Sequence, residues 1–180
     1  MLHATEKPKS RNDNFVWVDF ESNQELNYHK INYAIAIVQT ICEEGKQISC
    51  YVFNDRGGWL FSRFLGNSLE INIDNDFTLD NFKFQNLNIK LARNEQPSTI
   101  NYFGNFFFNN NDYKNHTFIA HYGKGFDFHP VAGWCLEHNV TPNTINNANK
   151  INYMKILSTR FIDSINFTVS TKSFSKNIWI

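Results

Sequence analysis

The sequence predicts an α/β domain built on a mixed sheet. Two observations support this class: short apolar segments rich in β-branched and aromatic residues recur along the chain, and one later segment repeats apolar residues at helical spacing. The predicted order is three strands, a helix, a strand, a helix and a strand. The chain has 180 residues, which is enough for one domain with its own core.

The first half of the chain supplies the predicted strands. A polar lead-in over residues 1–14 precedes a near-continuous apolar run that stops at an acidic pair. The three predicted strands span residues 15–20, 32–40 and 48–53. The glycine-containing segment at 55–58 is a strong turn signal, and we expect residues 59–65 to begin a helix after it.

The second half begins with a segment that has no sustained period. We expect residues 66–115 to form irregular strands and loops, with several asparagine runs. Thr117–Ala120 predicts a short strand, and a glycine-rich turn follows it. Thr159–Asp163 predicts a last strand that ends in an acid.

A helix is predicted between these two strands. Pro130 suits its first turn, where a missing N–H has no partner to lose. Four residues then recur at the spacing of one helix face, Val131, Trp134, Cys135 and His138. A Thr-Pro pair at 141–142 ends the segment.

Composition excludes several classes of protein. Lys and Arg number 17 and Asp and Glu number 17, so the formal net charge of zero gives no support for nucleic-acid binding. The cysteines at 42, 50 and 135 form no C-x-x-C pair, which argues against a zinc ribbon and a disulfide framework. We expect a soluble, intracellular protein without a membrane partner, because no secretory signal or long apolar run is present.

Acidic residues lie at or just after the ends of predicted strands. Asp19 and Glu21 are two residues apart on the first strand, so both side chains point to the same face. Asp127 and Asp163 follow later strands. Clustered carboxylates favour Mg²⁺, and paired ions of this kind can activate water for phosphodiester cleavage. The alternative is that D-x-E is an ordinary surface pair.

Three sequence strings resemble motifs of one enzyme family. VWVDFES resembles the first exonuclease motif of family B DNA polymerases, and FIAHYGKGFDF resembles the second. RFIDSIN is similar to the [YF]-D-S-L element of the protein-primed members found in linear plasmids, viruses and mobile elements. The resemblance covers roughly residues 14–22 and 117–180, and residues 66–115 are an unmatched insertion.

The resemblance implies a fold, a reaction and a metal. Residues 15–180 would form part of an RNase H-like 3′–5′ exonuclease domain of a DNA-directed DNA polymerase. Asp19, Glu21 and Asp127 match its catalytic, metal-binding acids, which hold two Mg²⁺ or Mn²⁺ ions in the intact family. Asp163 matches an ordering residue rather than a catalytic acid.

The resemblance also implies partners. The single-stranded 3′ end of DNA and a terminal priming protein would be bound by the residues that match the family's contact positions, Ser22, Tyr122, Phe126, Ser164 and Ile165. Tyr122 departs from the pattern, because the family has an asparagine there that helps to hold the 3′ end. Base stacking on an aromatic such as Phe126 tolerates any sequence.

Two further departures leave alternatives open. The family's third exonuclease motif and its polymerase palm have no counterpart up to Ile180, so we expect a truncated domain with weak activity of its own. The main alternative is a non-catalytic module that binds single-stranded DNA or a priming protein. Another is a free-standing exoribonuclease of the same acid-dependent class, although the D-S-I element at 163–165 favours the polymerase.

Overall fold

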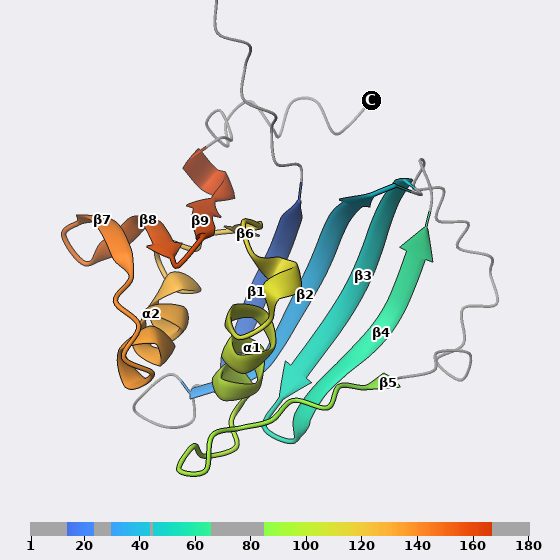
Figure 1. Ribbon diagram of the computed structural model, residues 1–180. Coiled ribbons are helices and arrows are strands. Elements are labelled where there is room, and N and C mark those ends of the chain that lie inside the picture. Colours follow the sequence, from blue (N-terminus) through green and yellow to red (C-terminus); the bar gives the residue numbers. More distant parts are fainter. Residues whose placement is uncertain (1–13, 24–29, 44, 66–84, 167–180) are drawn as a thin grey trace, which may run out of the picture.

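A nine-stranded mixed sheet with two helices forms the domain (Figure 1). The computed structural model describes residues 14–23, 30–43, 45–65 and 85–166. The strands are β1 (Phe15–Asn23), β2 (Lys30–Cys42), β3 (Gly45–Asn54), β4 (Gly57–Leu65), β5 (Gln85–Asn86), β6 (Thr117–Ala120), β7 (Asn143–Asn147), β8 (Lys150–Ile156) and β9 (Thr159–Asp163). The helices are α1 (Thr99–Phe108) and α2 (Phe128–Glu137), with short 3₁₀ turns η2 (Asn111–Tyr113) and η3 (Ser164–Asn166). The predicted α/β class with a mixed sheet is confirmed.

Strand β1 lies at the centre of the sheet, whose order is β5-β4-β3-β2-β1-β6-β9-β8-β7. On one side β2, β3 and β4 continue as an antiparallel meander. On the other side β6 and β9 run parallel to β1, and Val18, Ala120 and Asp163 lie in register across the three strands. The carboxyl ends of three parallel strands therefore meet at one edge of the sheet.

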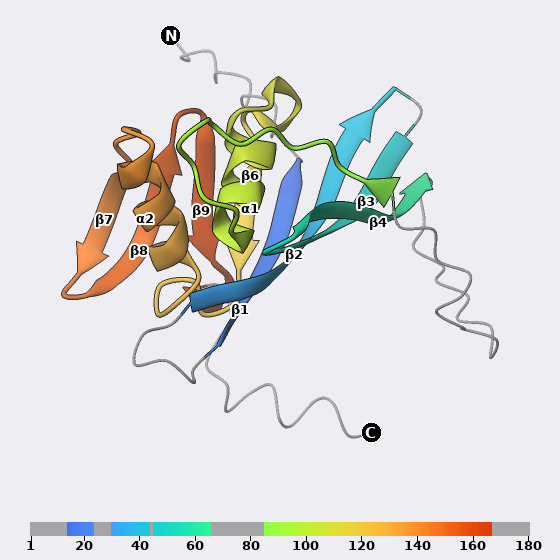
Figure 2. The ribbon, with the colours of Figure 1, turned by 90° about the horizontal axis from the view of Figure 1, so that it is seen from below.

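Both helices cover the same face of the sheet (Figure 2). Alternate β1 residues Val16, Val18 and Phe20 are buried on this face. The Phe103 ring of α1 lies 4.9 Å from the Phe20 ring, in an edge-to-face arrangement. Six phenylalanines of this core are fully buried, namely Phe53, Phe103, Phe107, Phe118, Phe128 and Phe161. Buried aromatic side chains of this kind remove a large apolar area from water and contribute strongly to core stability.

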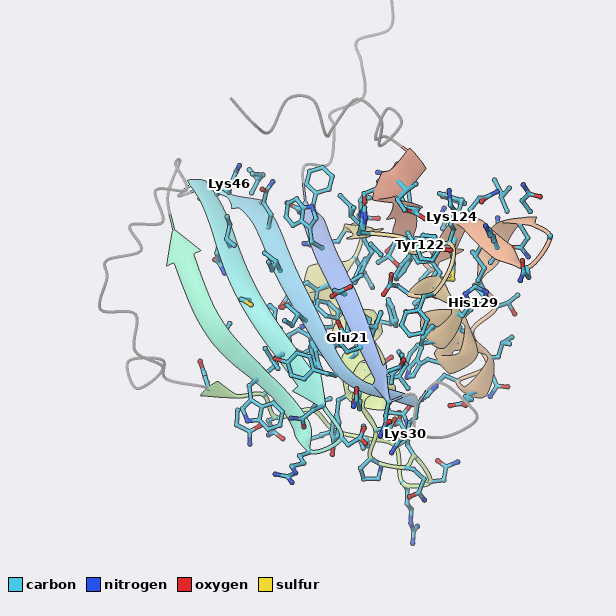
Figure 3. All side chains as sticks on the ribbon, turned by 180° about the vertical axis from the view of Figure 1, so that it is seen from behind. Glu21, Lys30, Lys46, Tyr122, Lys124 and His129 are labelled. Carbon is cyan, nitrogen blue, oxygen red and sulfur yellow. The ribbon has the colours of Figure 1, made fainter. Side chains whose placement is uncertain are left out.

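The opposite face of β1 and β2 carries the residues that alternate with the buried ones. Trp17, Asp19 and Glu21 are exposed there, and Ile35 and Ile37 are 36% and 40% exposed. Figure 3 looks onto this face, with the strands β1 to β4 in front of α1. Neither of the helices in the described part of the chain covers it. Asp19 and Glu21 thus share a face, as their spacing predicted.

The helix expected at 59–65 is wrong, because these residues belong to β4. A two-residue turn at Asp55 and Arg56 joins β3 to β4, and Asn54 pairs directly with Gly57. Gly57 takes a φ of 147°, which side-chain-bearing residues rarely adopt. Because this turn is so tight, residues 57–65 run back antiparallel to β3. Pairing with β3 then makes them a strand rather than a helix.

The expectation of irregular structure over 66–115 is also wrong in part. Residues 66–84 lie outside the described residues, but Thr99–Phe108 forms α1. The Ser98 side chain accepts a hydrogen bond from the N–H of Asn101 at the start of this helix. Asparagine and phenylalanine are weak helix formers, so burial of Phe103 and Phe107 against the sheet stabilises α1 more than propensity does.

The remaining predicted elements are confirmed, with one omission. Both β6 and β9 occur at their predicted positions, and α2 places Pro130 in its first turn. Val131, Trp134 and Cys135 are buried on the predicted face of α2. The hairpin formed by β7 and β8 was not predicted, because most of β7 is exposed asparagine. Among the described residues, no helix is long and apolar enough to cross a membrane.

A buried polar contact ties α2 to the segment before α1. Glu95, whose side chain is 6% exposed, lies 3.0 Å from Nε2 of His138 and also accepts from Nδ2 of Asn105. The His138 ring stacks on Trp134 with centroids 4.1 Å apart. A buried carboxylate needs such partners, since leaving one unpaired costs several kcal/mol (about 3–5).

The two helical glycines predict opposite effects of substitution by alanine. A Cβ atom at Gly104 of α1 would come within 2.3 Å of the Trp134 ring, whereas one at Gly133 of α2 meets nothing within 4 Å. We expect Gly133→Ala to raise the free energy of unfolding by about 0.5–1 kcal/mol, from helix propensity alone. We expect Gly104→Ala to lower it by about 1–3 kcal/mol through overpacking.

Urea unfolding of the two variants and the unaltered chain measures both changes, and each variant is the control for the other. Stabilisation by Gly104→Ala would show that α1 does not pack against Trp134 in this way.

Candidate acidic active site

Asp127 lies in the turn between β6 and α2 and reaches back to β1. Its Oδ1 accepts a hydrogen bond from the backbone N–H of Phe20 at 3.2 Å. Strand β6 ends at Ala120, which pairs with Val18, two residues before Phe20. Asp127 therefore binds β1 just beyond the point where β6 ends, next to Asp19. The residue is 3% exposed.

The carboxylates of this edge repel one another. Burial is the main cause that raises the pKa of Asp127 to about 6, and the negative charges of Asp19 and Asp163 raise it further. The hydrogen bond from Phe20 lowers the pKa and opposes part of this effect. Asp19, Asp127 and Asp163 thus lie close enough to interact, and we call them the acid cluster.

Asp163 has no exposure and uses both oxygens within the protein. Its Oδ2 accepts from the N–H of Lys124 at 3.0 Å, and its Oδ1 accepts from the N–H of Ile165 at 2.9 Å. These bonds hold the turn after β6 against the end of β9. The geometry matches an ordering residue, since little of this carboxylate is left for another ligand.

Glu21 follows Asp19 on the same exposed face of β1. The register with β2 shifts between Glu21 and Ser22, which pair with Tyr33 and Ile31, so that Asn32 is the extra residue of a bulge. Bulges re-aim side chains and are common beside active sites. Within the described ranges, no three His, Cys, Asp or Glu side chains form a ready metal-binding group. The structure brings Asp19 and Asp127 together, with Glu21 one strand repeat away.

The predicted DNA-binding residues lie around this edge. Ser22 is half-buried at the end of β1, and Phe126 packs partly against the core. Ser164 forms a hydrogen bond through Oγ with Nδ1 of His121 at 3.0 Å, and Ile165 is half-buried beside it.

His121 is a neighbour of the site that the sequence did not single out. A cavity of about 440 Å³ is lined by Asp19, His121 and Ser164 at the polar end, and by Trp17, Ile35, Ile37 and Ile119 at the apolar end. The three polar residues come from β1 and from the segments that follow β6 and β9. The sequence signal that could have identified His121 is its place directly after the parallel strand β6, because side chains that follow parallel strands converge at one edge of the sheet.

Tyr122 adopts a φ of 63°. This left-handed conformation costs most side chains roughly 1–2 kcal/mol, whereas asparagine tolerates it well. The asparagine expected at this position from the resemblance therefore has a conformational reason as well as a binding one. Tyr122 is 49% exposed.

Comparison with protein-family models, with curated proteins and with solved structures finds no match to this chain. The geometry of the acid cluster and the sequence motifs are therefore the basis for a functional assignment.

The raised pKa of Asp127 predicts how stability depends on pH. The folded state binds a proton more tightly than the unfolded state, so the carboxyl destabilises the fold increasingly as pH rises from about 4 to 6. We expect Asp127→Asn, which keeps the acceptor for Phe20, to raise the free energy of unfolding at pH 7 by about 2 kcal/mol. At pH 4 the two proteins should be nearly equal.

Denaturant unfolding between pH 4 and pH 7, in buffer with a chelator, tests this. The exposed Asp112→Asn variant is the control and should follow the unaltered chain at each pH. A constant difference between Asp127→Asn and the unaltered chain at every pH would contradict the assigned environment of Asp127.

Proposed function

We propose that the chain is a metal-dependent 3′–5′ exonuclease domain, which acts on the 3′ end of single-stranded DNA within a DNA-directed DNA polymerase. The observation that carries this proposal is the buried carboxylate of Asp127, which is bonded to Phe20 and interacts with the charge of Asp19. Perturbed acids at the carboxyl ends of parallel strands are typical of catalytic sites.

The sheet supports the same proposal. Three parallel strands, β1, β6 and β9, lie beside the antiparallel strand β2 and its neighbour β3. An RNase H-like domain is expected to have this arrangement of strands. The string VWVDFES lies within β1, and FIAHYGKGFDF runs from β6 into α2, so the two motif-like strings lie on adjacent strands.

The residues at this edge suit a divalent cation. Asp19, Glu21 and Asp127 would hold Mg²⁺ or Mn²⁺, since these hard ions prefer carboxylate oxygens. Burial, and then the charges of Asp19 and Asp163, raise the pKa of Asp127, and a bound cation would favour its charged form. When bound, such ions activate a water and stabilise the leaving oxygen of a phosphodiester.

Other residues position the substrate in this proposal. The bond from Phe20 fixes the Asp127 carboxylate, and Asp163 fixes the turn that carries it. Ser164, oriented by His121, contacts the single-stranded DNA. Phe126 presents part of its ring toward a second cavity of about 570 Å³, where a base near the 3′ end can stack.

A second candidate is a non-catalytic module that binds single-stranded DNA or a priming protein. One observation favours it: the predicted DNA-contact residue Ser164 lines a cavity together with His121 and Trp17, and a contact there needs no cation. The two candidates differ in their response to metal and in product formation.

Metal binding predicts a gain in stability. An ion that binds only the folded state raises the free energy of unfolding by about 1.4 kcal/mol when its concentration is ten times the dissociation constant. We expect millimolar Mn²⁺ to raise the melting temperature of the unaltered chain and to have much less effect on Asp19→Ala. The Asp112→Ala variant should respond like the unaltered chain. An equal response of Asp19→Ala would place the bound ion elsewhere.

Nuclease activity is measured as release of labelled 3′ nucleotides from a short single strand in Mn²⁺. We expect slow release by the unaltered chain and a fall of about 10²-fold or more for Asp19→Ala, because the loss of one electrostatic stabiliser costs about that factor. Asp112→Ala should keep the rate. DNA binding without release would support the non-catalytic module, and release that survives Asp19→Ala would contradict the proposed site.

A further inference from the structure

One row of apolar side chains crosses the face of the sheet that α1 and α2 leave open. The strand registers place Ile37 of β2 beside Trp17 of β1, and Trp17 beside Ile119 of β6. Residues paired in this way point to the same side of a sheet. Followed from β3 to β8, the row consists of Cys50, Ile37, Trp17, Ile119, Ile162 and Tyr153. Each of these side chains is at least partly exposed.

This face is apolar where a sheet that faces water is normally polar. A sheet with one face in water alternates apolar and polar residues, whereas a sheet covered on both faces is apolar on both. Ile35 and Ile41 extend the apolar surface along β2, at 36% and 49% exposure. The apolar end of the cavity of about 440 Å³ is a hollow in this surface. A contiguous exposed apolar surface of this kind marks an interaction site.

Charged side chains lie at the two ends of this surface. Asp19 and Glu21 stand on β1 toward its carboxyl end. Lys30 of β2 lies at the same end, but its Nζ is 3.0 Å from Oδ2 of Asp55 and the two charges offset each other. Lys46 begins β3 at the opposite end, and Figure 3 shows Glu21 and Lys46 toward opposite ends of the strands. The surface is therefore acidic at one end and basic at the other.

The strand register places the apolar row midway between these ends. Glu21 pairs with Tyr33 of β2, and Lys46 pairs with Ile41. Because paired residues share a face, Lys46 points to the open face together with Ile41. Tyr33 and Ile41 are about 27 Å apart along the extended strand. Ile37, which belongs to the apolar row, lies halfway between them.

We propose that a second copy of this chain covers the open face, so that two sheets pack face to face about a twofold axis. An axis at the level of Ile37 exchanges the two ends, which brings Glu21 of each copy near Lys46 of the other. The same axis packs the two apolar rows together. The surface is thus complementary to itself in charge and in hydrophobicity, as a symmetric contact requires. The inference goes beyond the nuclease proposal and does not rest on it.

Sedimentation velocity at increasing micromolar concentrations, in buffer with a chelator and little salt, measures this association. We expect the unaltered chain to form a dimer as its concentration rises. Ile37→Lys should weaken the dimer by about 100-fold or more, because symmetry places a buried charge on both copies. Leu136→Lys is the matched control and should dimerise like the unaltered chain, since Leu136 is 69% exposed and lies on α2, on the other side of the sheet.

Charge reversal tests how the two copies are arranged. Glu21→Lys and Lys46→Glu should each weaken the dimer about ten-fold, because each brings like charges together at both ends of the interface. The double variant restores opposite charges and should recover most of this loss. Asp112→Lys reverses an exposed charge in η2 and should leave the dimer unchanged. A double variant that recovers nothing would contradict the proposed twofold contact.

The remaining outcomes separate the possible occupants of the face. An unaltered chain that stays monomeric at the highest concentration would overturn the proposal. Greater destabilisation by Ile37→Lys than by Leu136→Lys in such a monomer would show that residues outside the described part of the chain cover the face. A dimer that survives Ile37→Lys and both charge reversals has its interface elsewhere, which also overturns the proposal. Melting temperatures identify a variant that does not fold, and Ile35→Lys on the same face then replaces Ile37→Lys.

Discussion

The hydrogen bond between the Asp127 carboxylate and the N–H of Phe20 holds the site together. It joins the turn after β6 to the central strand, at the point where strand pairing between β1 and β6 stops. This bond connects the turn to the carboxyl end of β1 and thereby holds the Asp127 carboxylate near Asp19. Burial at this position, and then the charges of Asp19 and Asp163, raise the pKa of Asp127, and the bond from Phe20 offsets only part of that rise. Stability and charge placement are therefore in conflict at this one residue, as is common where a site serves chemistry.

The sequence predicted those strands and helices whose buried face is visible as alternating or helically spaced apolar residues. The central strand and α2 each show their buried face in the sequence, through Val16 and Val18 in one case and Val131 and Trp134 in the other. Asp19 and Asp127 were predicted as partners from their places after strands, and the structure brings them together. The bond from Phe20, the bulge at Asn32 and the contact between His121 and Ser164 join segments that are distant in sequence, so sequence spacing could not predict them.

The missed elements have one physical cause in common. Helix α1 and the β7–β8 hairpin consist largely of residues with weak local preferences, and each is stabilised by what it packs against or pairs with. The Phe103 ring, for example, lies 5.5 Å from that of Phe53, fifty positions earlier. The prediction of a helix at residues 59–65 was wrong for a related reason. The segment pairs with β3, and this pairing overrides its local preference. Tyr122 is a different case: the sequence marked it as a departure from a binding motif, and its positive φ, which asparagine tolerates better, makes the departure a conformational one as well.

Asp163 links two loops through a single side chain. Its oxygens accept from Lys124 in one loop and from Ile165 in the other, and the residue is fully buried. Neither loop can open without leaving a buried carboxylate oxygen unsatisfied, which is costly. The two segments are thus expected to open as one cooperative unit, with a common opening free energy and similar protection of their amides from hydrogen exchange. A displacement of the β6–α2 turn is therefore expected to displace the segment at the end of β9 on the same timescale.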